Sequence, residues 1–331
     1  MRSTHRSRAG LVASVLTATL ALAACGAGPT EEPAAAGGTV EVTDNTGVVT
    51  VPFPAQRVAA TDNKAFRTLE EWDIPLVAAP VDLMPEEMSY RQDSSIANMG
   101  THREPNLEAL VGANPDLVVN GGRFSDQADE IRAAAPDAAV LTFDPQDGKP
   151  LDEELKRQVL GLGTAFGRED DAQQLADALD AAAARATEAY DPEQTVMGLL
   201  TSGRTISYVA PVTGRSIGPV FEILGLTPAL DTAADDVSHG DDISVEAIAA
   251  ANPDWLLVLD RDAPLSSTGE DYVPAADLIQ NSPALQNVPA VRDNKIVYLA
   301  SNFYLTEDIQ AYTELFESIA DAFESNAAPA S

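Results

Sequence analysis

The sequence of 331 residues is poor in cysteine and in basic side chains. Its single cysteine excludes an intramolecular disulfide framework and a cysteine-rich zinc site. The 20 lysines and arginines stand against 52 aspartates and glutamates, so the formal net charge is −32. We therefore exclude nucleic acid as a partner, since its binding needs clustered cations. The acidic residues are spread along the chain and predict a solvated surface, on which any cationic site must be assembled locally.

Signatures of catalysis are also scarce. The chain has three histidines and no H-E-x-x-H motif. The glycine-rich stretch Gly161–Gly167 differs from a dinucleotide fingerprint in spacing and follows no strand, so we interpret it as helix packing and termination. A secreted α/β hydrolase is therefore a disfavoured alternative, and we predict neither enzymatic activity nor a permanent cofactor.

Long apolar runs are missing as well, although the N-terminus contains a short one. Three arginines in the first eight residues precede an apolar segment, Leu11–Ala24. This segment is shorter than the roughly 20 apolar residues that a membrane-spanning helix needs. A basic start, an apolar centre and small residues before a cleavage point are typical of a secretory signal, which we predict over residues 1–24.

The residues at the end of this segment indicate lipidation. Leu22–Gly26 resembles the bacterial lipobox, which implies cleavage before Cys25 and a diacylglyceryl group on its sulfur. An ordinary signal cleavage nearby is the alternative. Residues 25–38 are poor in bulky apolar side chains and predict a flexible tether. We expect the protein on the extracytoplasmic face of the cell membrane, held by its lipid.

The rest of the chain contains one pattern twice. Leu107–Arg123 reads LEALVGANPDLVVNGGR, and Val245–Arg261 reads VEAIAAANPDWLLVLDR. Each copy starts with helical periodicity, breaks at Asn-Pro-Asp and continues as a short apolar run typical of a buried parallel strand. The arginine that ends each copy should therefore lie at the carboxyl end of a strand, where open α/β sheets bind ligands. Two matched arginines favour an anion site over two solvated loops.

Strands and helices alternate on both sides of one long predicted helix. This order predicts an α/β fold of two Rossmann-like α/β lobes, joined by the single helix, with a ligand cleft between them. The predicted ranges are residues 39–167 for the N-terminal lobe, 168–190 for the linker helix and 191–331 for the C-terminal lobe.

Three local features extend this prediction. The residues TVEVTDNTGVVTVP predict a hairpin. Asn63 is predicted to cap the helix that follows the first inner strand, Arg57–Ala60. The last helix is predicted from about Thr306 to Glu324.

Further candidate ligands lie in loops. Arg215 lies in APVTGRSIGP and Tyr304 in ASNFYLTED. Two histidines follow the signal, and His239 ranks above His102 because it precedes a glycine in a loop that leads into the second repeat. Imidazole and phenolate both ligate iron. A lone loop histidine is more often a surface residue, so these positions alone do not establish a metal site.

Taken together, these segments resemble the lipid-anchored solute-binding proteins of siderophore ABC importers. The resemblance is to the helix-linked two-lobe type, in the branch for enterobactin, petrobactin and other catecholates, and it covers nearly all of the chain after the signal. The matching motifs are Gly122-Arg123, Thr213–Gly218, His239–Ser244, Asp260-Arg261 and Tyr304-Leu305.

This resemblance implies a role for each candidate. Arg123, Arg215 and Arg261 would surround an anionic ferric complex, and His239 and Tyr304 would complete the iron's coordination where the siderophore leaves positions open. Guanidinium groups suit this task because they are always charged and present a planar fork of donors. We predict a ferric siderophore, of anionic catecholate type, as the transported ligand.

Some alternatives stay open. Asp241 in the histidine loop and Ser216-Ile217 after Arg215 depart from the family's usual residues and leave the siderophore unidentified. Haem, cobalamin or a bare metal ion are other ligands for this fold, although three arginines argue against a bare cation.

The remaining prediction concerns the transporter. Glu108 and Glu246 begin the two repeat helices, and in this family such a pair docks onto arginines of the membrane permease, one lobe to each subunit. A favourable interaction of each glutamate with its helix dipole is an equally adequate account. We expect a monomer whose partners are the ferric siderophore, the ABC importer permease and the membrane.

Overall fold

The computed structural model describes residues 37–233, 238–266 and 272–326. The chain divides into two units, Met1–Ala36 and Gly37–Ser331. The predicted signal peptide, Cys25 and nearly all of the predicted tether belong to the first unit and lie outside the described residues. In the part of the chain that is described, no helix is long and apolar enough to cross a membrane.

The first lobe is built on a sheet of five parallel strands in the order β5-β4-β3-β8-β9. Its central strands are short, apolar and buried, as expected for a sheet covered on both faces. The strands are β3 (Val58–Ala60), β4 (Leu76–Ala79), β5 (Ala97–Asn98), β8 (Leu117–Asn120) and β9 (Ala139–Thr142). The helices are α1 (Phe66–Glu71), α2 (Ser89–Gln92), α3 (Leu107–Ala113) and α4 (Ala128–Ala134), with 3-10 turns at Val81–Leu83 and Gly122–Gln127.

Two hairpins accompany this sheet. The predicted N-terminal hairpin forms from β1 (Gly38–Asp44) and β2 (Gly47–Phe53), and a smaller one forms from β6 (Gly100–Thr101) and β7 (Glu104–Pro105). The Asp44 carboxylate accepts from the backbone N–H of Thr142 at 2.7 Å, which ties the first hairpin to β9.

The second lobe is built on a mixed sheet in the order β13-β11-β10-β14-β15, with β12 also paired to β10. The long strands β10 and β14 run parallel through its centre. The strands are β10 (Thr195–Ser202), β11 (Thr205–Val209), β12 (Thr227–Pro228), β13 (Asp241–Asp242), β14 (Trp255–Asp260) and β15 (Ile296–Tyr298). The helices are α7 (Gly218–Leu224), α8 (Val245–Ala251), α9 (Ala263–Ser266), α10 (Ala275–Gln280), α11 (Pro289–Arg292), α12 (Phe303–Thr306) and α13 (Ile309–Asn326).

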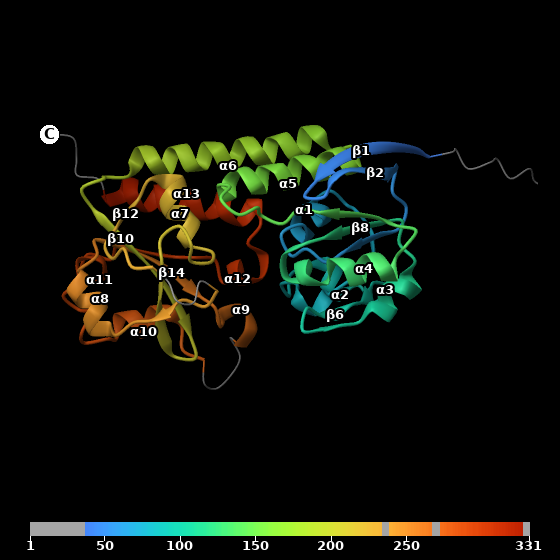
Figure 1. The fold of residues 1–331 in the computed structure, drawn as a ribbon. Coiled ribbons are helices and arrows are strands. Elements are labelled where there is room, and N and C mark those ends of the chain that lie inside the picture. The colour runs from blue at the N-terminus through green and yellow to red at the C-terminus, as the bar shows by residue number, and fades with distance from the viewer. Residues whose placement is uncertain (1–36, 234–237, 267–271, 327–331) are drawn as a thin grey trace, which may run out of the picture. The chain divides into compact units, whose positions relative to one another are not determined.

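A pair of helices connects the two sheets. α5 (Leu151–Phe166) leads into α6 (Glu169–Ala189), which coincides with the predicted linker helix and packs along both α5 and α13 (Figure 1). Gly167 ends α5 in the left-handed conformation, and Gly163 lies so close to Ala172 that an added Cβ would approach it to 2.6 Å. The glycine-rich stretch thus serves helix packing and termination, as predicted.

The Asn-Pro-Asp break ends a helix in the same way in both repeat copies. Asn114 and Asn252 are the C-caps of α3 and α8, with φ of 45° and 52°. Asparagine tolerates this left-handed conformation better than most residues, and the following proline cannot continue the helix. The prediction that these asparagines end their helices is confirmed.

The aspartate of each motif then aligns two neighbouring strands. Asp116 accepts from the backbone N–H groups of Gln56 and Arg57, at 2.7 and 3.0 Å, just before β3. Asp254 accepts from the backbone N–H of Thr195, at 2.8 Å, where β10 begins. The repeated motif therefore turns a helix into a strand and fixes that strand against its neighbour.

Two local predictions were wrong. Asn63 does not cap a helix: α1 has Ala65 at its N-cap, and the Asn63 amide donates to the Thr306 carbonyl at 2.9 Å instead. The last helix does not start at Thr306, because Glu307 adopts a left-handed conformation, with φ of 50°, between α12 and α13. Asp308 then accepts from the Ala311 N–H at 2.7 Å, so α13 has its own start.

Candidate functional site

Three arginines gather around one aromatic ring. The guanidinium carbons of Arg123, Arg215 and Arg261 lie 4.8, 4.7 and 5.3 Å from the ring centre of Tyr304. Arg123 follows β8, Arg215 lies between β11 and α7, Arg261 follows β14, and Tyr304 belongs to α12. We call these four residues the arginine–tyrosine cluster. Its members come from both lobes, and the tyrosine is 4% exposed.

The arginines keep unused donors. Arg123 donates to the backbone carbonyl of Tyr304 at 2.7 Å, and Arg261 donates to the Ser202 hydroxyl at 3.1 Å. The Nε atoms of Arg123 and Arg261 are buried and have no hydrogen-bond partner among the described residues. Buried donors are rarely left unpaired in proteins, so these groups are suited to a ligand that brings acceptor oxygens.

The cluster alters the acidity of the tyrosine. Burial alone would raise the pKa of Tyr304, but a hydrogen bond from Arg261 and the charges of all three arginines outweigh it, so its pKa lies below the ordinary value. Burial and the charge of Arg215 lower the pKa of Arg123. The positive charges of the three arginines thus favour the phenolate of Tyr304, which is the form of tyrosine that ligates Fe(III).

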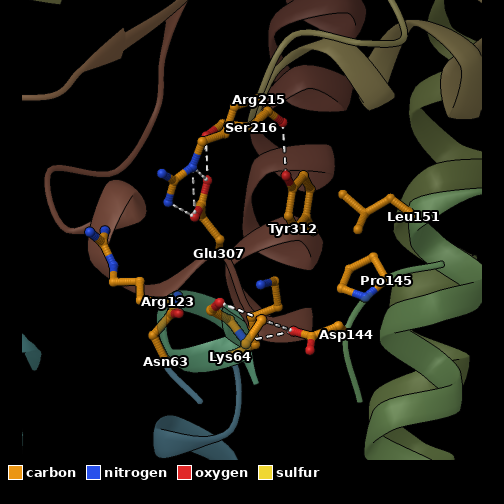
Figure 2. Close-up of a pocket in the computed structure, with 12 residues that line it drawn as sticks. Asn63, Lys64, Arg123, Asp144, Pro145, Leu151, Arg215, Ser216, Glu307 and Tyr312 are labelled. Atoms are coloured by element: carbon orange, nitrogen blue, oxygen red, sulfur yellow. Dashed lines mark hydrogen bonds and ion pairs between the residues drawn. The ribbon is translucent and has the colours of Figure 1, made fainter. Parts of the chain in front are cut away.

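A cavity of about 400 Å³ lies beside the cluster, and Figure 2 shows residues that line it. Residues of both lobes contribute to its wall: Asn63, Lys64, Gly122, Arg123, Ser125, Asp144, Pro145, Leu151, Arg215, Ser216, Glu307 and Tyr312. The wall combines cations, carboxylates and apolar side chains, so the cavity can receive a polar ligand with an apolar or aromatic portion.

Two glycines allow Arg123 to reach this cavity. Gly122 has φ of 56°, and a Cβ on it would meet the side-chain oxygens of Asn63 and Asp62 at 2.4 and 2.7 Å. Its N–H donates to the Asp144 carboxylate at 2.8 Å. Only glycine fits here without strain, which explains why a glycine stands between β8 and Arg123.

The two histidines occupy different surroundings. His239 lies in an exposed turn ahead of β13. His102, in the hairpin of β6 and β7, is half-buried, and its Nδ1 atom is buried without a partner among the described residues. Burial and then the charges of Arg123, Arg103 and Arg215 lower the pKa of His102, so its imidazole is neutral near pH 7. The rank of His102 below His239 rested on the glycine that follows His239, and nothing in the sequence shows that β6 and β7 bring His102 near the arginines.

The structure also reveals an acidic partner of Arg215 that the sequence did not indicate. Glu307 is buried, and its carboxylate accepts from Arg215 Nε at 2.9 Å, from Arg215 Nη2 and from the Ser216 hydroxyl at 2.5 Å (Figure 2). Ser216 stands in Gly214–Gly218, which has the G-x-S-x-G spacing of a hydrolase nucleophile elbow. Its proton goes to a carboxylate and not to a histidine, so the match has no catalytic geometry.

No group of three or more His, Cys, Asp and Glu residues within the described ranges is arranged to hold a metal ion.

Glu108 and Glu246 are exposed in the first turns of α3 and α8. Asn106 and Ser244 are the N-caps of these helices. The side chain of Asn106 accepts from the N–H of Ala109 at 3.3 Å, and that of Ser244 accepts from the N–H of Ala247 at 3.1 Å.

Comparison with known proteins gives a consistent picture. A family model described as periplasmic binding protein matches residues 58–303. The ferric-anguibactin-binding protein FatB of Vibrio anguillarum is 27% identical over 270 residues, which cover 81% of this chain and 82% of FatB. The petrobactin-binding protein YclQ of Bacillus subtilis is 24% identical over 279 residues, with 83% and 84% covered.

Solved structures agree on the fold. The YclQ crystal structure aligns with a TM-score of 0.73 at 23% identity, covering 87% of this chain and 99% of YclQ. The catecholate-siderophore-binding protein VctP of Vibrio cholerae aligns with a TM-score of 0.73 at 22% identity, covering 87% of this chain and all of VctP, 100%. The predicted two-lobe α/β fold is confirmed.

Proposed function

We propose that this chain, which belongs to the periplasmic binding protein family, captures an anionic ferric siderophore in the arginine–tyrosine cluster and delivers it to an ABC importer. The family consists of solute-binding proteins and not enzymes. Relatives named for ferric anguibactin and for petrobactin support iron chelates as the ligand class. The observation that carries the proposal is that three guanidinium carbons lie 4.7 to 5.3 Å from the centre of one buried tyrosine ring.

The chemistry of the cluster fits a catecholate complex. Two catecholates bind Fe(III) with one net negative charge and leave two coordination positions open. The Tyr304 phenolate would fill one position, and His239 would fill the other after its turn closes over the ligand. The unpaired Nε donors of Arg123 and Arg261 would bind catecholate oxygens. Haem, cobalamin and bare metal ions are not favoured by the relatives.

Attachment and delivery complete the proposal. Lipid on Cys25 would hold the protein, as a monomer, at the outer face of the membrane. Glu108 and Glu246 are exposed at equivalent places on the two lobes, which suits a pair of contacts with two permease subunits. Charge reversal of both should stop uptake and leave ligand affinity unchanged.

A titration tests ligand capture. Quenching of tryptophan fluorescence should give a dissociation constant for a ferric bis-catecholate, and a neutral ferric tris-hydroxamate should bind much more weakly. Equal affinity for both complexes, or binding of neither, would overturn the proposal.

A further inference from the structure

Glu307 places a negative charge inside a site built to attract anions. The residue is 6% exposed, and its carboxylate accepts hydrogen bonds from Nε and Nη2 of the Arg215 guanidinium (Figure 2). Burial alone would raise the pKa of Glu307, but hydrogen bonds and charge from Arg215 outweigh it and lower that pKa. The group is therefore a carboxylate at neutral pH, and it opposes an anionic ligand.

The backbone is strained to achieve this arrangement. Glu307 has φ of 50° and Ser216 has φ of 67°, although neither is glycine. Such conformations cost about 1 kcal/mol or more for ordinary residues and cluster at functional sites. The two strained residues are bonded to each other, because the Ser216 hydroxyl donates to the Glu307 carboxylate. The backbone strain thus lies at the contact between Ser216 and Glu307, and the same Glu307 carboxylate binds Arg215.

A charge count shows what Glu307 changes. The three arginines of the cluster supply three positive charges, and Glu307 removes one, which leaves two. Lys64 and Asp144 line the same cavity with opposite charges, and the lowered pKa of His102 keeps that ring neutral. A ferric bis-catecholate that also binds the Tyr304 phenolate carries two negative charges and balances the cluster. A ferric tris-catecholate carries three and leaves one unmatched.

We propose that Glu307 sets the charge of the ferric complex that the cleft accepts, by cancelling one arginine and favouring complexes with one net negative charge over those with three. This inference rests on the proposed function of the same site. It narrows the ligand class to tetradentate catecholates, whose open iron positions the protein fills itself. Glu307 acts through its ion pair with Arg215, and we therefore assign it a role in ligand specificity.

The test compares two ligands on two proteins. Ferric complexes of a tetradentate bis-catecholate and a hexadentate tris-catecholate are titrated into the wild type and into Glu307→Gln. Glutamine keeps an oxygen for Arg215 but removes the charge. In Glu307→Gln the affinity for the tris-catecholate, relative to that for the bis-catecholate, should rise by on the order of tenfold to a hundredfold. The reason is that the two ferric complexes differ by two negative charges, so the loss of one carboxylate charge favours the more negative complex.

A matched buried pair provides the control. Glu154 accepts from Arg157 Nε and Nη2 at 3.1 and 2.7 Å, and the side chains are 6% and 26% exposed, against 7% and 31% for Glu307 and Arg215. Glu154→Gln should leave the ratio unchanged. Glu307→Asp should weaken both complexes while the ratio stays near that of the wild type.

A measurement without ligand separates this inference from the proposed function. The Tyr304 phenol is titrated by ultraviolet absorbance in the apo protein, with Tyr304→Phe as the reference. Its pKa should fall further in Glu307→Gln, because a neighbouring negative charge is lost. An unchanged phenol titration and an unchanged ratio would overturn the inference. Failure of the wild type to bind either complex would instead overturn the proposed function. The phenol titration would then still show whether Glu307 sets the charge of the cluster.

Discussion

The two repeat copies are alike up to their strands and differ where the strands end. In the first copy β8 stops at Asn120 and two glycines precede Arg123, whereas in the second β14 continues to Asp260 and Arg261 follows directly. Both guanidinium groups nevertheless reach the ring of Tyr304, at 4.8 and 5.3 Å. The common part positions the strands, and the ends adapt each arginine to its lobe.

Because the two strand ends differ, Arg123 and Arg261 make different contacts. Arg123 donates to the backbone carbonyl of Tyr304 and so links the first lobe to α12 of the second. Arg261 donates to Ser202 within its own lobe. The Asp260 carboxylate holds the strand end by accepting from the Tyr272 hydroxyl at 2.8 Å. Arg123 thus joins the lobes, while Arg261 is fixed locally.

The largest effect is expected from removing these arginines one at a time. Arg123→Ala and Arg261→Ala should each weaken a ferric catecholate by about 2–5 kcal/mol, because a charged contact is lost in a partly desolvated site. Arg123→Ala should also reduce lobe closure, measured by small-angle scattering with and without ligand. Affinity for a neutral ferric hydroxamate serves as the control, and equal losses for both ligands would contradict a charge mechanism.

A second contact between the lobes differs from the cluster in being rich in carboxylates. Asp308, before α13, is buried, and its Oδ2 has no partner among the described residues. Burial raises the pKa of Asp308 to about 7, with the charges of Glu314 and Glu71 adding to burial and the Ala311 N–H and Arg67 opposing it.

This raised pKa fixes the sign of a pH effect. The folded state holds the proton more tightly than the unfolded state, whose aspartate pKa is about 3.9. The contribution to stability is complete below about pH 4 and is lost as pH rises through about 7. Asp308→Asn should therefore match the wild type near pH 4 and exceed it by a few kcal/mol near pH 8 in urea unfolding. A constant difference across this range would contradict the assignment.

Removal of the motif aspartates Asp116 and Asp254 should have a smaller effect, on the free energy of unfolding, and the effect should be equal in the two repeat copies. Asp116→Ala and Asp254→Ala each leave backbone N–H groups at a strand start without their charged acceptor. Each change should cost about 1–3 kcal/mol of unfolding free energy and leave ligand affinity unchanged, since neither residue lines the cavity. A loss confined to one copy would show that the repeat is not a shared structural device.

The smallest effect is expected at the motif asparagines. Asn114→Gly and Asn252→Gly should change stability by less than about 1 kcal/mol, because glycine also adopts the left-handed conformation. The matched alanine variants should be less stable than the glycine variants by roughly 1 kcal/mol, measured by thermal unfolding. The opposite order at either position would argue against the left-handed cap.

The residues of the site whose positions depend on local pattern could be predicted from the sequence. The repeat predicted that Arg123 and Arg261 lie at strand ends, and family resemblance added Arg215 and Tyr304 to the same cluster. The break at Glu307 could not be foreseen, because a left-handed glutamate is unusual and its partner Arg215 is distant in sequence.

The wrong cap at Asn63 has a similar cause. Its side chain suits an N-cap by type, but the amide is taken by the Thr306 carbonyl of the other lobe. Contacts between residues so far apart are set by packing of the two lobes, which local propensity does not report. The same limit applies to His102, which the β6–β7 hairpin places near the arginines.

Under the proposed function, a ferric catecholate is held against the Tyr304 phenolate. The most direct measurement is the charge-transfer absorption of a ferric bis-catecholate on titration into the wild type and into Tyr304→Phe. A protein phenolate on the iron should shift the band on binding to the wild type, and the shift should be absent in the variant, which binds more weakly. The same spectrum and the same affinity in both proteins would contradict the account and reduce Tyr304 to a wall of the cleft.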